Sequence, residues 1–262
     1  GIARKTETIY YQQLNLHDAP PRRTRTGGET LAKSLLGPHR EAMGVFGENI
    51  LVTRGLSMLK LLRLLALSLG GSSSLTWMGN EFGQIDSIDL PRPANGYTEA
   101  NARVQYELGE TKGLRFKHLE AFEMCLNRTE AVIGWLSDLA YSSLAQDDDA
   151  KVLAFARGGC VFAFNFHPGT CHQGYQLSVP TELGLGPELV TALDTDDPRF
   201  GGAGPTPNAR KPAKVQGGVL PLTLPPRTAL VLVPAAKASE LTGDSFLQLQ
   251  TVDEVLDMAQ GA

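Results

Sequence analysis

Two pairs of polar residues each follow an apolar run that is typical of a strand. His17 and Asp18 come directly after the alternating run Thr8–Leu16, and Asn80 and Glu81 follow the run Leu75–Met78 across a single glycine. A carboxylate held at the end of a strand can attack a substrate or exchange protons with it. These four residues are therefore candidate site residues. The alternative is that each pair only caps the turn after its strand.

A third group of residues that could take part in chemistry, as metal ligands, lies in one short stretch. It consists of His167, Cys171 and His172. Imidazole and thiolate are zinc ligands, but Pro168 and Gly169 indicate a turn between strands, and no second ligand cluster follows. We therefore expect no metal site. The chain has three cysteines, an odd number, which argues against a disulfide framework and favours a reducing compartment.

The elements expected around the first two pairs alternate between strand and helix. A short helix is predicted over Thr30–Leu36 and a longer one over Arg54–Leu69, which Gly70 and Gly71 would end. Further helices are predicted over Thr98–Leu108 and Gly113–Asn127. Strands that alternate with helices indicate parallel βα units, in which the carboxyl ends of the strands gather the site residues.

A different pattern begins after the acidic run Gln146–Asp149, and we place a domain boundary near residue 145. Val152–Arg157 and Cys160–Phe166 flank Gly158-Gly159, which predicts a hairpin. More strands are expected at Tyr175–Val179, Glu188–Leu193, Val219–Leu224 and Thr228–Val233. Residues 146–234 are therefore predicted to form a small antiparallel β-sandwich.

The last segment, residues 235–262, is predicted to be a tail with one short amphipathic helix. Thr251 and Glu254 have the spacing of a capping box, and Val252, Val255 and Leu256 supply an apolar face. We expect this helix to dock on its own protein or to fray, rather than to bind a partner.

Composition and charge exclude two broad function classes. The chain has 262 residues, of which 42% are hydrophobic, and a net charge of -4, so a general phosphate-binding surface and a nucleic-acid partner are not expected. The most apolar run, Leu56–Leu69, is interrupted by Lys60 and Arg63 and is too short to span a bilayer. The chain begins with Gly1, and we expect the native beginning to lie elsewhere.

A series of short motifs closely resembles successive landmarks of the eukaryotic-type 1,4-α-glucan branching enzymes, relatives of the α-amylases. The motifs are Leu75–Gly83, Asp89–Arg92, Asn127–Glu130, Gly134–Leu136, Phe162–Pro168, Leu193–Asp196, Phe200–Gly202 and Pro225–Val231. They occur in the family's order. Further upstream, Leu16-His17-Asp18 and Gly28–Ala32 are similar to two other family segments, although the loop between them is longer and the usual lysine is missing.

The resemblance implies a transferase that cuts an α-1,4 link and joins the released segment to a 6-hydroxyl with retention, which needs a nucleophile and an acid/base. The family carries both on earlier barrel strands, and no segment here matches them. By resemblance, Asp18 is the acid that stabilises the transition state and His17 contacts sugar hydroxyls. Asn80 and Glu81 shape the last βα loop of the site. No metal or organic cofactor is implied, the partner is an α-glucan polysaccharide, and the location is the cytoplasm or a plastid.

The implied fold is the last two βα units of a TIM-type (β/α)8 barrel over residues 1–145, followed by the sandwich. A whole barrel takes about 250 residues, so an upstream segment or a complementing subunit must close it, and the chain alone is predicted to be inactive. Two alternatives stay open, a non-catalytic subunit of a larger complex and a glucan-binding module. Trp77 and Trp135 could stack on sugars, but we expect both to be buried.

Overall fold

The computed structural model of the protein describes residues 43–44, 49–85, 88–111, 113–204, 212–244, 247–249 and 251–260. The predicted strand at Thr8–Leu16 and the predicted helix at Thr30–Leu36 lie outside these residues. The described residues divide into two units. The first unit contains the described residues up to Leu56 and the segment Leu75–Glu120. The second unit contains Ser57–Ser74 and the described residues from Ala121 onwards.

Helix α3, Ile50–Leu69, begins and ends at local signals. The side-chain oxygen of Asn49 accepts from the backbone N–H groups of Leu51 and Val52 at 3.1 and 3.2 Å, which satisfies two donors that a helix leaves unpaired. Gly71, at φ 109°, lies just beyond the last turn. The predicted helix is confirmed and starts at Ile50. Because the helix is apolar on most sides, it suits a place where more than one face is covered.

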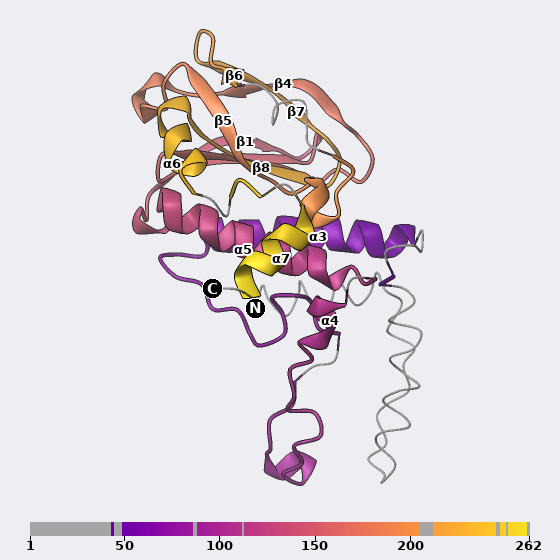
Figure 1. Ribbon diagram of the computed structural model, residues 1–262. Helices are drawn as coiled ribbons and strands as arrows, with labels where there is room; N and C mark the ends of the chain where they lie inside the picture. The colour runs from indigo at the N-terminus through magenta and orange to yellow at the C-terminus, as the bar shows by residue number, and fades with distance from the viewer. Residues whose placement is uncertain are drawn as a thin grey trace. The chain divides into compact units, whose positions relative to one another are not determined.

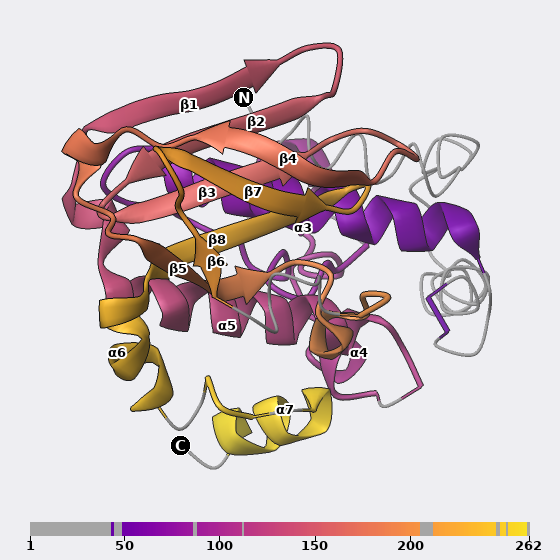
Figure 2. The ribbon, with the colours of Figure 1, turned by 90° about the horizontal axis from the view of Figure 1, so that it is seen from above.

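The second unit is built on two antiparallel sheets. The larger sheet has the strand order β1-β2-β3-β8-β5-β6, and β4 pairs with β7 in the smaller one (Figure 2). The strands are β1 Tyr141–Asp147, β2 Val152–Arg157, β3 Cys160–Asn165, β4 His172–Ser178, β5 Glu188–Asp194, β6 Ala213–Lys214, β7 Val219–Leu224 and β8 Thr228–Pro234.

The larger sheet is covered on both faces. One face packs against α3 and against α5, Phe116–Ile133 (Figure 1). The side chains in this contact include Leu61, Phe122, Phe162 and Val231. The other face packs against the smaller sheet. Strands buried on both faces have continuous apolar sequences, which is why β2, β3 and β8 lack alternation. The predicted all-β domain is confirmed, and a helical layer lies against it.

The turn between β2 and β3 depends on two glycines. Gly158 and Gly159 have φ values of 57° and 73°, the left-handed region that a two-residue hairpin requires. A Cβ at Gly158 would lie 2.5 Å from the Cα of Trp135, whereas a Cβ at Gly159 would approach only the Nζ of Lys237, at 3.5 Å. The predicted hairpin is confirmed, and at Gly158 glycine also allows close packing on Trp135.

The first unit differs from the sequence-based expectation. Leu75–Met78, predicted as a strand, is irregular, and the helix predicted over Thr98–Leu108 is present only at its last two residues, where α4, Glu107–Glu110, begins. The helix predicted over Gly113–Asn127 is present as α5. No parallel strand pair occurs among the described residues, so the incomplete barrel is not confirmed. The physical reason is that an extended segment becomes a strand only when a neighbour completes its hydrogen-bond ladder.

Short helical pieces complete the described chain. The 3₁₀ turns are Pro93–Asn95, Trp135–Ser137, Thr181–Leu183, Pro198–Phe200 and Ala235–Lys237, and the tail holds α6 Ala238–Thr242 and α7 Val252–Gln260. None of the described helices has the length and apolar character needed to cross a bilayer.

Candidate functional site

The structure describes two of the four predicted site residues. His17 and Asp18 lie outside the described residues. Asn80 and Glu81 are half-buried in a tight turn that follows the irregular segment Leu75–Met78. The backbone N–H of Asn80 donates to the carbonyl of Trp77 at 3.0 Å, and that of Gly83 donates to the carbonyl of Asn80 at 3.1 Å. The pair therefore occupies a fixed turn and not the end of a paired strand.

Gln84 anchors this turn to the chain around residue 104. Its backbone N–H donates to the carbonyl of Gly79 at 2.7 Å, and its side-chain oxygen accepts from the backbone N–H of Gln105 at 2.8 Å. The ring of Phe82 is buried, and its centroid lies 6.2 Å from that of Tyr106. The loop around Glu81 is thus braced by hydrogen bonds and by apolar packing, which is what a side chain that orients a ligand needs.

Three carboxylates come together around this loop. Burial raises the pKa of Glu120, and the carboxylates of Glu81 and Glu110 raise it further. Gly109 leaves room for this arrangement, because a Cβ there would lie 2.2 Å from a carboxylate oxygen of Glu120. A carboxyl group with a raised pKa can act as a proton donor. It does not make a retaining site by itself, because that chemistry also needs a nucleophile across the scissile bond.

The two tryptophans have different environments. Trp135 is fully buried and packs edge to face against Phe162, with ring centroids 5.4 Å apart, so its predicted burial is confirmed. The prediction for Trp77 is wrong, since 48% of that residue is exposed. It stands in the irregular segment, where the described residues provide no strand to cover it.

Lys60 holds the family-like motif Leu193–Asp196 against α3. Its Nζ is buried and donates to the carbonyls of Thr195 and Phe200 at 2.5 and 2.8 Å. Burial lowers the pKa of Lys60 to about 8, and Asp196, Asp194 and Asp197 partly oppose this effect. Lys60 therefore joins α3 to the loop after β5. Its position within an apolar run did not by itself indicate this structural role.

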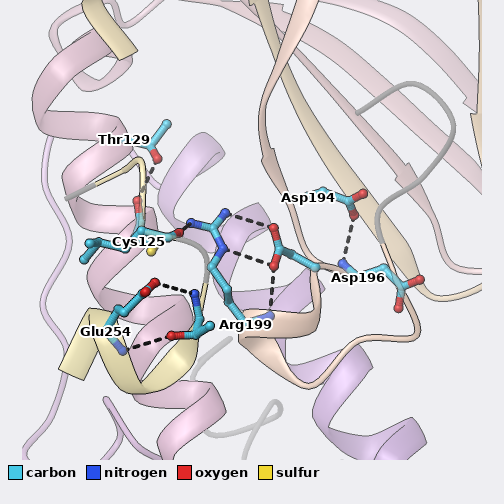
Figure 3. A network of polar contacts seen from close by, with 9 residues as sticks. Cys125, Thr129, Asp194, Asp196, Arg199 and Glu254 are labelled. Atoms are coloured by element: carbon cyan, nitrogen blue, oxygen red, sulfur yellow. Dashed lines mark hydrogen bonds and ion pairs between the residues drawn. The ribbon is translucent and has the colours of Figure 1, made fainter. Parts of the chain in front are cut away.

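Arg199 joins the same loop to the tail. Its guanidinium, at the centre of Figure 3, donates to the carboxylate of Asp197 at 2.9 Å and to the carbonyl of Leu249 at 2.8 Å. The predicted capping box is present. The backbone N–H of Glu254 donates to the Thr251 hydroxyl at 3.2 Å, and the backbone N–H of Thr251 donates to the Glu254 carboxylate at 3.0 Å. This cluster fastens the tail and has no feature of a catalytic site.

The stretch with His167, Cys171 and His172 has a structural explanation. The Nδ1 of His167 accepts from the backbone N–H groups of Gly169 and Thr170, at 3.1 and 2.7 Å. The Nε2 of His172 lies 2.8 Å from the carbonyl of Ala150. In the part of the chain that the structure describes, no three His, Cys, Asp or Glu side chains form a group that could hold a metal ion.

The other two cysteines are poor nucleophiles. Cys125 and Cys160 are buried and unbridged. Burial raises the pKa of Cys125 to about 11 and that of Cys160 to about 12. Both thiols therefore stay protonated near neutral pH, and a protonated thiol neither attacks a substrate nor binds a metal well.

Sequence reasoning missed two residues. Lys60 counted only as a charge that interrupts an apolar helix, and that interruption was itself the available signal for a buried partner. Tyr97 is the second. It is 67% exposed and has φ 56°, an uncommon value for an aromatic residue. The dipeptide Asn95-Gly96 just before it is a turn signal that would have placed it at a loop tip.

Comparison with known proteins agrees with the motifs. Residues 143–235 match the family described as the α-amylase C-terminal all-β domain. The 1,4-α-glucan-branching enzyme of Yarrowia lipolytica is 37% identical over 204 residues, which cover 76% of this chain and 28% of that enzyme. The branching enzymes of Dictyostelium discoideum and Aspergillus oryzae are 38% and 41% identical over 156 and 153 residues, or 59% and 58% of this chain and 22% of each enzyme. The resemblance to eukaryotic branching enzymes is confirmed.

The chain spans less than a third of the length of these relatives, since it covers 28% of the Yarrowia enzyme and 22% of the other two. The activity of the complete relatives is therefore only proposed for this chain.

Proposed function

We propose that this chain is the carboxy-terminal part of a 1,4-α-glucan branching enzyme, which cuts α-1,4 links and forms α-1,6 branches in starch or glycogen with retention. The observation that carries the proposal is the 37% identity to the Yarrowia branching enzyme over 76% of the chain. The all-β unit supports it, because residues 143–235 match the family described as the α-amylase C-terminal all-β domain.

The chemistry divides between this chain and residues that it lacks. The nucleophile and the acid/base would come from an upstream segment, because no motif here matches either. Asp18 would stabilise the transition state, and His17 would contact sugar hydroxyls. Asn80 and Glu81 would shape the wall of the site. The hydrogen bonds that fix the turn around them support that role, and so does the raised pKa of the nearby Glu120.

The architecture would be the last part of a barrel over residues 1–145, the β-sandwich over 146–234 and the tail over 235–262. Apolar side chains in the first unit, among them Leu75, Trp77 and Met78, are exposed. This exposure supports the proposal that a further segment packs over them. That cover would be the upstream barrel segment or a complementing subunit. The substrate would be an α-glucan polysaccharide. The location would be the cytoplasm or a plastid. The name of the rice relative describes that enzyme as chloroplastic/amyloplastic.

The test is branching activity with and without the missing barrel strands. We expect residues 1–262 alone to leave the iodine spectrum of amylose unchanged. Joining them to an upstream segment that carries the nucleophile and the acid should restore the spectral shift, and Asp18→Asn in the joined protein should abolish it. A shift produced by residues 1–262 alone would contradict the division of chemistry proposed above.

A further inference from the structure

The loop Asp89–Tyr97 is held rigid by its own polar side chains. The carboxylate of Asp89 accepts from Nε of Arg92 at 2.8 Å and from the side-chain amide of Asn95 at 3.1 Å. The same amide donates to the carbonyl of Leu90 at 3.0 Å, and its oxygen accepts from the backbone N–H of Arg92 at 2.9 Å. Asn95 is therefore an internal brace, and the loop is ordered without help from a hydrophobic core.

The rigid loop presents Tyr97 to solvent in a costly conformation. Its backbone N–H donates to the carbonyl of Arg92 at 3.0 Å, and its φ of 56° follows a left-handed Gly96 at 66°. Among the other described non-glycine residues with positive φ, Lys151 lies in the turn of the β1–β2 hairpin and Arg227 in the short connection from β7 to β8. A large aromatic residue is unusual in this region of backbone space, and such strain tends to persist where a side chain has a task.

The groups beside Tyr97 define the ligand that would fit. The side chains of Arg92 and Asp89 are 60% and 31% exposed and form an ion pair, so the loop offers hydrogen-bond donors and acceptors without net charge. A paired guanidinium does not favour an anion such as phosphate. An exposed aromatic face beside neutralised polar groups suits a neutral, polyhydroxylated ligand with apolar ring faces, which is the chemistry of a sugar.

We propose that the Asp89–Tyr97 loop is a glucan contact, in which the Tyr97 ring stacks on a glucose unit while Arg92 and Asp89 hydrogen-bond its hydroxyls. The sugar chemistry follows from the loop itself. The choice of an α-1,4-glucan rests on the proposed function. The loop binds glucan without taking part in bond cleavage.

The experiment measures the affinity of residues 1–262 for maltoheptaose and for amylopectin by titration and by affinity electrophoresis. Tyr97→Ala should weaken binding several-fold, and Tyr97→Phe should keep it, because stacking needs the ring and not the hydroxyl. Tyr141→Ala is the matched control, since Tyr141 is 63% exposed but lies on β1. It should bind as the unchanged chain does.

Tyr97→Asn separates binding from stability. Asn tolerates positive φ, so this change should raise the thermal midpoint, by about 2–4 °C for each kcal/mol of relieved strain. It should also lose glucan affinity as Tyr97→Ala does. A ring that is merely packed by protein would give the opposite sign, a lower midpoint with unchanged affinity, and this result would overturn the proposal.

The outcomes also separate this inference from the proposed function. If the unchanged chain fails to bind amylopectin, or binds cellohexaose equally well, the glucan contact is wrong while branching by a completed enzyme is unaffected. If binding depends on Tyr97 but the completed enzyme never branches glucan, the proposed function fails and the contact stands.

Discussion

Lys60 is the residue whose environment differs most from what its type would suggest. An amine in water has a pKa near 10.5, but burial beneath the loop after β5 brings this one to about 8. The two carbonyls that it contacts belong to residues 135 and 140 positions further along the chain. No local pattern contains that information, so the sequence could mark the lysine as an anomaly in an apolar helix but could not name its partners.

The shift predicts how stability changes with pH. Between pH 8 and pH 10.5 the unfolded chain still holds the Lys60 proton while the folded protein has released it, so the free energy of unfolding should rise with pH. Over the whole interval the contribution is about 3 kcal/mol, and it is lost again as pH falls to 8. Urea unfolding at several pH values measures it.

A second lysine provides the control for that measurement. Lys60→Met should remove this part of the pH dependence, whereas Lys214→Met, on an exposed side chain, should leave it. Equal slopes in the unchanged chain and in Lys60→Met would show that the buried amine does not titrate as described.

At the scale of elements, the β2–β3 hairpin makes a stability prediction with a built-in comparison. Gly158→Ala should cost about 3 kcal/mol or more, because it adds a strained φ to a clash with the Trp135 backbone. Gly159→Ala meets only the tip of a flexible lysine and should cost about 1 kcal/mol. Thermal and urea unfolding of both variants measure the difference. Equal losses would mean that Trp135 does not pack as closely as described.

The hairpin also shows which elements the sequence could predict. Val152–Arg157 and Cys160–Asn165 pair through a turn whose glycines are local, so both strands and their register were predictable. Leu75–Met78 has an equally apolar sequence but needs a distant partner strand to become one, and none is present among the described residues. β1 was missed because its acidic end resembled a linker, although Asp147 caps the turn by accepting from Ala150 N–H at 2.8 Å.

The tail helix α7 should contribute to the stability of the second unit. Val255 is fully buried in the core that α5 and the larger sheet share, although it lies only a few residues from the end of the described chain. Val255→Ala should lower the free energy of unfolding by about 1–2 kcal/mol through the lost methyl groups and the cavity that remains. Asp257→Ala, on the exposed side, should change it by less than about 0.5 kcal/mol. A tail that does not dock would make the two variants alike in urea unfolding.

At the scale of the whole molecule, the two units differ in how completely their apolar side chains are buried. The second has a core on each face of its larger sheet. The first leaves Leu75, Trp77 and Met78 exposed at 92%, 48% and 43%. Neighbouring apolar residues exposed to this extent are a liability in an isolated protein. The sequence motifs could identify the relatives of this chain, but local patterns could not show which surfaces the remaining chain of such an enzyme would cover.

That exposure predicts self-association of residues 1–262, which light scattering over a range of concentrations would detect. Replacing Leu75, Trp77 and Met78 together by Ser should reduce it, since the apolar surface that drives association would be gone. Leu139→Ser removes another leucine, 71% exposed, from the second unit and should have little effect. If the chain is a clean monomer, or if Leu139→Ser reduces scattering as much as the triple change, the segment is not an open interface. Joining the proposed upstream segment should then lower scattering no further, whereas an open interface would be closed by it.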